Sequence, residues 1–124
     1  MQIDGVRQIG IHVKDLDTIV AFYRDVLGLP FLGQFGDLAF FDCNGMRLMF
    51  GKEEEPGQAQ SSTILYFRVD DIDLGHAELS EKKVKVEQAP HIVSKEMYIE
   101  TWLAFYRDPE DNIFALMGEK PLSD

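Results

Sequence analysis

Residues 9–17, with the sequence IGIHVKDLD, decide the fold of this chain. From residue 8 to residue 13, apolar side chains alternate with a mixed set, which predicts a strand with one apolar face. Asp15 is a favourable N-cap, and apolar residues at helical spacing follow it as far as Leu27. The sequence therefore predicts a strand that runs directly into a helix, which Gly28 ends.

The same junction occurs a second time. Residues 13–17 and 69–73 share the pattern V-x-D-[L/I]-D. Three strands are expected after the first helix, at about 31–35, 37–42 and 46–50. In the second half we expect a strand at 63–69, a helix capped by Asp71, a short strand at 84–88, a loop at 89–97, and strands at 98–107 and 112–118. The order β-α-β-β-β is thus predicted twice.

This order predicts an α+β fold of two tandem βαβββ modules that form a curved half-barrel with a central cavity. Residues 1–124 are expected to be one domain. Module one covers about 5–52, a polar linker about 53–62, and module two about 63–119. Neither module has enough apolar residues to fold alone, so the two should pack together. A concave sheet face of mixed polarity is a natural site for a small molecule.

The composition of the chain excludes some classes of binding partner. The chain has 124 residues, a formal charge of −10, 45% hydrophobic and 27% charged residues. An acidic surface repels nucleic acid and anionic membranes, so we expect neither as a partner. The single cysteine, Cys43, fits a reducing compartment, and we see neither a secretory signal nor a membrane-spanning run. A cytoplasmic protein is expected.

Three stretches resemble the vicinal oxygen chelate superfamily, which includes glyoxalase I, bleomycin-resistance proteins and extradiol dioxygenases. They are residues 9–17, residues 22–29 (FYRDVLGL) and residues 105–112 (FYRDPEDN). The resemblance implies the tandem-module fold. It also implies where the family's enzymes hold a metal ion, on the first, fourth, fifth and eighth strands, with His or Gln, Glu, His and Glu as the usual ligands.

Those positions can be carried over one by one. The resemblance places them at Gln8, at Leu48 or Met49, at Ile64 and at Ala115. A glutamine is tolerated at the first position in some glyoxalases, but hydrocarbon side chains cannot bind a divalent ion. The resemblance therefore implies a family member without the metal site and without a cofactor.

We expect the cavity to hold a small organic ligand instead. On the seventh strand, Leu103 and Phe105 suit the helix side, so the even-numbered residues should face the cavity. The ligand-binding residues we expect are Gln8, His12, Tyr66, Arg68, Trp102 and Tyr106. A structural role for the histidine stays open, and so does an interior filled by the protein's own aromatic side chains.

The sequence thus favours a metal-independent binding protein of the bleomycin-resistance type, which sequesters an aromatic or drug-like molecule as a homodimer. The alternative is an enzyme of the family, a lyase, isomerase or dioxygenase. It would use a non-standard metal site or metal-free acid–base catalysis by His12 and Tyr66. A module that binds another protein through its sheet edges is a third reading and predicts a solid interior.

Overall fold

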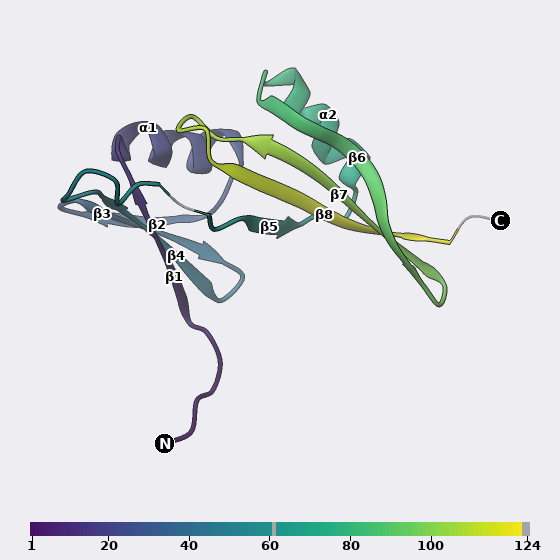
Figure 1. The fold of residues 1–124 in the computed structure, drawn as a ribbon, viewed down its shortest axis with the longest axis horizontal. Helices are drawn as coiled ribbons and strands as arrows, with labels where there is room; N and C mark the ends of the chain where they lie inside the picture. Colours follow the sequence, from purple (N-terminus) through teal and green to yellow (C-terminus); the bar gives the residue numbers. More distant parts are fainter. Residues whose placement is uncertain (61, 123–124) are drawn as a thin grey trace. The chain divides into compact units, whose positions relative to one another are not determined.

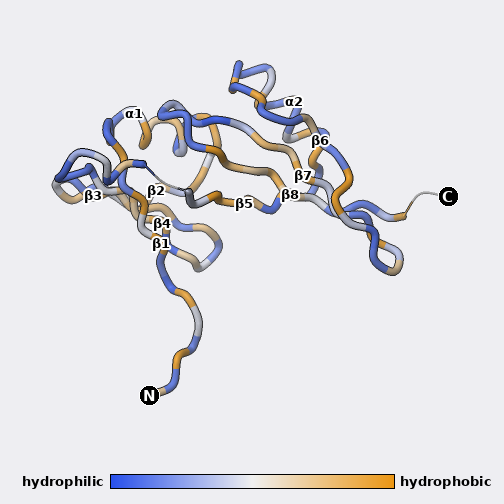
Figure 2. Tube along the Cα trace, in the orientation of Figure 1, coloured by the Kyte–Doolittle hydropathy of each residue, from blue (hydrophilic) through white to orange (hydrophobic). Residues whose placement is uncertain are grey.

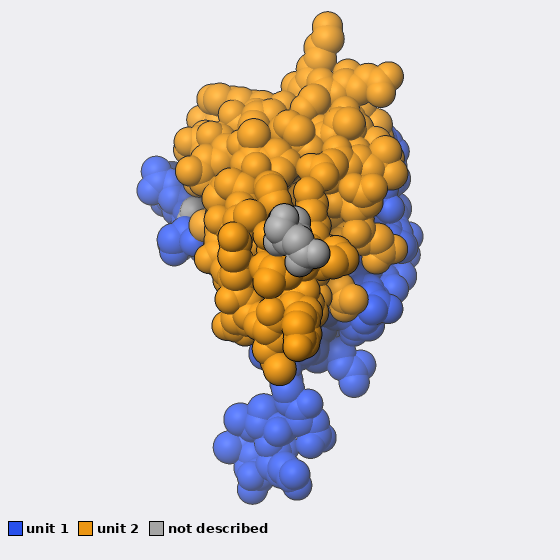
Figure 3. Space-filling view, turned by 90° about the vertical axis from the view of Figure 1, so that its right-hand side faces the viewer, with its two compact units in different colours: residues 1–62 blue, residues 63–124 orange. Residues whose placement is uncertain are grey.

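A computed structural model describes residues 1–60 and 62–122 of the chain. The chain divides into two compact units, unit 1 at Met1–Ser62 and unit 2 at Thr63–Asp124 (Figure 3). The predicted linker contains Ser61, which lies outside the described residues. None of the helices in the described part of the chain is long and apolar enough to cross a membrane.

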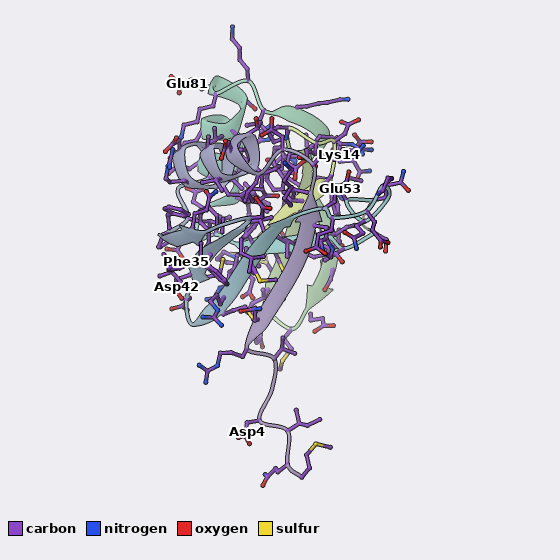
Figure 4. The ribbon with its side chains drawn as sticks, turned by 90° about the vertical axis from the view of Figure 1, so that its left-hand side faces the viewer. Asp4, Lys14, Phe35, Asp42, Glu53 and Glu81 are labelled. Carbon is purple, nitrogen blue, oxygen red and sulfur yellow. The ribbon has the colours of Figure 1, made fainter. Side chains whose placement is uncertain are left out.

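Unit 1 contains one four-stranded sheet with a helix on one face (Figure 1). The strand order is β1-β4-β3-β2, in which β1 and β4 are parallel and the other neighbours antiparallel. The elements are β1 (Gln8–Val13), α1 (Leu16–Ala21), the π-helix η1 (Phe22–Val26), β2 (Phe31–Phe35), β3 (Leu38–Cys43) and β4 (Met46–Lys52). The residues before β1 extend away from the rest of the unit, and Asp4 lies far out on this segment (Figure 4).

The predicted junction after β1 is confirmed. The Asp15 carboxylate accepts a hydrogen bond from the backbone N–H of Thr18 at 3.1 Å, which caps α1. A second bond, from the Thr18 hydroxyl, is the largest cause that lowers the pKa of Asp15. The predicted continuous helix instead widens into a π-helix after Ala21, and this wider turn buries both Phe22 and Tyr23.

The core of unit 1 lies between the helices and one face of the sheet. Phe41 of β3 and Phe50 of β4 are fully buried there. The Tyr23 ring packs against Phe50 with 4.7 Å between ring centroids. Val13 and Leu48 complete this side. Because neighbouring residues of a strand point to opposite faces, the other face of the sheet carries a different set of side chains.

Unit 2 repeats the topology, which confirms the two tandem βαβββ modules. Its strand order is β5-β8-β7-β6, with β5 parallel to β8 and the other neighbours antiparallel. Figure 1 shows α2 on one side of this sheet. The elements are β5 (Leu65–Arg68), α2 (Ile72–Glu81), β6 (Lys85–Glu96), β7 (Ile99–Arg107) and β8 (Ile113–Pro121).

The second helix is capped like the first. The Asp71 carboxylate accepts from the backbone N–H of Leu74 at 3.1 Å. The helix then lies close to β8 at Gly118, where an added Cβ would be only 3.0 Å from Cβ of Ile72. Figure 2 shows β8 as mostly hydrophobic and the loop that follows α2 as hydrophilic. Glycine at this point permits the close packing of helix on sheet.

One predicted boundary is wrong. A loop was expected at 89–97, but β6 continues from Lys85 to Glu96. Its pairing with β7 shifts register at three places, so the strand is irregular. Pro90 is tolerated inside it because β6 is the edge strand of the sheet, where a missing N–H need not cost a ladder hydrogen bond.

The polar segment after β4 forms a hydrogen-bonded loop. The Glu53 carboxylate accepts from the backbone N–H of Ala59 at 3.0 Å. The Gln58 side-chain oxygen accepts from the backbone N–H groups of Glu54 and Glu55 at 2.7 and 3.1 Å. Glu53 itself donates its backbone N–H to the carbonyl of Val13 at 2.8 Å, which ties the loop to β1 (Figure 4). This acidic segment is therefore a structured loop.

Candidate functional site

The sheet face of unit 1 that points away from α1 is called here open face 1. Strand register assigns its members, because Gln8, Gly10 and His12 of β1 pair with Arg47, Met49 and Gly51 of β4. The β3 residues in the same rows are Leu38, Phe40 and Asp42. The predicted common face of Gln8 and His12 is confirmed, while their role in binding a ligand stays a prediction.

Gln8 is held by two neighbours on β4. Its side-chain oxygen Oε1 accepts a hydrogen bond from Nε of Arg47 at 2.7 Å. Its amide nitrogen Nε2 lies 3.7 Å from Sδ of Met49. Leu48 points to the opposite face and is only 2% exposed. Of the two fourth-strand candidates, Met49 is therefore the one that faces Gln8.

These side chains do not fit the metal set that the resemblance implies. The oxygen of Gln8 already accepts from a guanidinium, a fixed positive charge that opposes a cation at the same atom. Met49 offers a thioether, which suits soft ions and not hard ones. Ile64 and Ala115 offer only hydrocarbon. Within residues 1–60 and 62–122, no group of three or more His, Cys, Asp and Glu side chains is placed to hold a metal ion.

His12 lies at the end of open face 1, opposite Gly51. Its side chain is exposed. The part of the chain that the structure describes gives the imidazole no hydrogen-bond partner, which disfavours the structural role left open by the sequence. The exposed ring is accessible to a ligand.

Open face 2 is the corresponding face of unit 2, turned away from α2. Two rows of paired residues cross it, Tyr66–Ala115–Phe105 and Arg68–Met117–Leu103. The Tyr66 and Phe105 rings meet edge to face with 6.0 Å between centroids. Ala115, between them in the register, is fully buried. Tyr66 is 50% exposed, so this face presents an accessible aromatic surface.

The predicted orientation of Tyr106 and Trp102 is wrong. Both lie on the α2 side of the sheet. The Tyr106 hydroxyl is 2.8 Å from Nδ1 of His76, a residue of α2, and its ring stacks on Phe114 at 5.4 Å. Burial raises the pKa of Tyr106 from its ordinary value of 10.0 to about 12. Tyr106 is a core residue.

The Trp102 side chain also lies on the face of the sheet that carries α2. Its Nε1–H donates to the carboxylate of Glu100 at 3.2 Å. The ammonium of Lys120 lies 4.0 Å from its ring and also pairs with Asp73 of α2 at 2.6 Å. The prediction failed because both faces of β7 are apolar, so alternation could not tell which face meets the helix.

Two residues of the open faces were missed. Arg47 touches Gln8 only because β1 and β4, which are far apart in sequence, lie parallel and adjacent. His91 was assigned to a loop, but it lies on β6 with its ring 6.2 Å from that of Phe105. Its Nδ1 is 2.9 Å from the carbonyl oxygen of Ala89. Nothing local in the sequence marks either contact.

Two curved-sheet modules in tandem, each with one helix, define a class of protein that the comparisons with known families identify. Residues 5–116 match the Glyoxalase/Bleomycin resistance protein/Dioxygenase superfamily, and the chain belongs to it. A relative in Bacillus subtilis (strain 168), the uncharacterized protein YraH, is 36% identical over 88% of this chain and 94% of its own.

Solved structures agree on the fold. The crystal structure of lactoylglutathione lyase from Agrobacterium tumefaciens superimposes with a TM-score of 0.77 at 22% identity, over 95% of this chain and 96% of that one. A glyoxalase/bleomycin resistance protein/dioxygenase from Alicyclobacillus acidocaldarius gives a TM-score of 0.71 at 17% identity, over 93% and 91% of the two chains. At these identities the likeness concerns the fold alone.

Proposed function

We propose that this member of the superfamily binds a small organic molecule without a resident metal ion. The observation that carries the proposal is the identity of the side chains at the family's four ligand positions. One is an amide whose oxygen is held by Arg47, one is a thioether, and two are hydrocarbon. Such a set leaves a ligand to be held by stacking, apolar contact and hydrogen bonds.

Each open face carries groups for such contacts. Open face 1 has Phe40 and Met49 beside Arg47. Open face 2 has Tyr66 and Phe105, with Arg68 at its edge. Aromatic rings and thioethers favour a flat organic molecule, and a few polar groups fix its orientation. Gln8, His12, Tyr66 and Arg68 are therefore kept as proposed ligand contacts.

An enzyme is the second candidate, favoured by the exposed and unpartnered imidazole of His12. Histidine is the side chain that most often serves as a general base in enzymes. A guanidinium such as that of Arg47 can stabilise negative charge that develops on a substrate. Conversion of a bound molecule by the native chain, with a much larger loss of turnover than of affinity in His12→Gln, would establish this candidate.

Native mass spectrometry of freshly purified protein tests the binding proposal. We expect an adduct with the mass of a small organic molecule that denaturation releases. The same sample, digested and analysed for zinc, nickel, iron and manganese, should contain none of them in stoichiometric amount. A chain free of organic adducts that carries one metal ion per protein would refute the proposal and promote the enzyme.

We further propose a cytoplasmic homodimer. Each sheet has two edge strands, which are paired on one side only. They are β1 and β2 in unit 1, and β5 and β6 in unit 2. Such edges favour association with a second copy. Light scattering after size exclusion should give twice the 14.2 kDa of the chain, and a monomer at all concentrations would refute the dimer.

A further inference from the structure

We propose that Arg47 makes the site selective for organic anions, so that the ligand is a flat molecule carrying a carboxylate. The inference rests on the proposed binding function and adds the charge of the ligand to it. Arg47 has no carboxylate partner, but two neighbouring side chains hold its guanidinium in place.

Four basic residues of the described chain pair with carboxylates, and two of them are arginines. Arg24 pairs with Asp25 at 2.8 Å and Arg107 with Glu87 at 3.0 Å. Arg47 forms no ion pair with any residue in 1–60 or 62–122, although the chain has 22 acidic residues against 12 basic ones. Its guanidinium thus has no carboxylate in ion-pair contact within these residues.

The nearest candidate partner is directed elsewhere. Asp42 lies opposite Arg47 in the register of β3 and β4. Its Oδ1 accepts a hydrogen bond from the backbone N–H of Gly45 at 3.0 Å, and this bond closes the turn between β3 and β4 (Figure 4). The carboxylate therefore stabilises its own turn and leaves the guanidinium to other acceptors.

The guanidinium is held in place before any ligand arrives. Its Nε donates to Gln8 Oε1 at 2.7 Å, and its carbon Cζ lies 5.2 Å from the centroid of the Phe40 ring. These contacts use one of the five N–H groups of the side chain and leave the terminal nitrogens available. A planar fork of N–H donors fits a carboxylate in two parallel hydrogen bonds.

The surroundings suit the rest of such a molecule. Phe40 lies in the same row as Met49, and its ring is 6.0 Å from that of Phe35. A flat hydrocarbon can rest on these side chains while its carboxylate faces Arg47. An oriented guanidinium without a carboxylate partner, Arg47, thus lies beside the aromatic and thioether side chains of Phe40 and Met49. This arrangement points to an aromatic or conjugated acid as the ligand.

The test compares 2-naphthoate with 2-naphthamide, which has nearly the same shape without the charge. Calorimetry should show naphthoate binding at least 10-fold more tightly. Arg47→Met should weaken naphthoate about 10- to 100-fold, the range expected for lost charge-assisted hydrogen bonds, and leave naphthamide unchanged. Arg47→Lys should recover only part of the affinity, because it keeps the charge and loses the fork.

Arg24→Met is the matched control, since it changes the net charge equally on a residue of the π-helix. It should bind naphthoate like the native chain. In nitrogen-15 spectra, naphthoate should shift the Gln8 side-chain amide and Arg47 Nε. Four results would overturn the inference. Two concern the probes: naphthoate does not bind, or it binds no more tightly than naphthamide. The others are equal losses of affinity in the two arginine variants and spectral shifts confined to Arg68 and Tyr66. Native mass spectrometry for a co-purified molecule tests the wider binding proposal separately.

Discussion

Tyr106→Phe removes a single oxygen from the core of unit 2 and tests the role that the structure gives this residue. The side chain is fully buried, and its hydroxyl is 2.8 Å from Nδ1 of His76. Near neutral pH we expect a loss of about 1 kcal/mol in the free energy of unfolding, which is typical for a hydrogen bond within a protein; this one joins buried Tyr106 to partly buried His76. The ring itself keeps its packing.

The cost should depend on pH in a defined direction. Burial raises the pKa of Tyr106 from 10.0 to about 12, so between these values the unfolded chain releases a proton that the folded chain keeps. The unfolded state then binds fewer protons, and stability falls as pH rises. At about pH 11, one unit above the unfolded value, the native chain should have lost about 1.4 kcal/mol for this reason.

Tyr106→Phe has no hydroxyl to ionise at this position, so its stability does not fall for this reason. Near pH 11 the difference between the two proteins should therefore shrink to about zero or reverse. Urea unfolding followed by the fluorescence of Trp102, which lies in the same unit, measures it at both pH values. Tyr98→Phe is the control, because Tyr98 is 81% exposed and its loss should cost nothing at either pH. A difference between native and Tyr106→Phe that is the same at both pH values would refute the reasoning.

Other consequences concern two closely packed glycines and the cap of α2. Gly118→Ala should destabilise the chain by about 1–3 kcal/mol, because the new methyl group meets Cβ of Ile72 at 3.0 Å and neither backbone can easily move. Gly10→Ala should cost less, since its methyl group would meet only the mobile end of Met49 at 3.2 Å; urea midpoints that rank the two variants in the reverse order would contradict this packing. Asp71→Ala should cost about 1 kcal/mol through the lost cap of α2, and an unchanged urea midpoint would show that the cap contributes nothing.

Sequence reasoning reached the fold because its signals are local. The strand-to-helix junctions at 13–17 and 69–73 each carry an N-cap aspartate, and both caps are present. Strand alternation also placed Gln8 and His12 on one face, because β1 has apolar residues on one side only. These features depend on neighbours within a few positions of the chain.

The site was harder to predict because it depends on pairing between distant strands. Tyr106 was assigned to the wrong face because β7 is apolar on both sides, and tertiary contacts such as that with His76 are needed to distinguish the faces. Arg47 was overlooked because its contact with Gln8 joins residues that are 39 positions apart. Burial and pairing of this kind cannot be seen in a local pattern.

Whether the chain holds a metal ion can be measured by calorimetric titration of chelator-treated protein with Zn²⁺ and Ni²⁺. We expect no stoichiometric binding, and the same heats for the native chain and for Gln8→Ala. Tight binding of one ion per chain that Gln8→Ala or Met49→Ala abolishes would contradict this expectation. The ion would then be coordinated by Gln8 and Met49, although the Gln8 oxygen already accepts a hydrogen bond from Arg47.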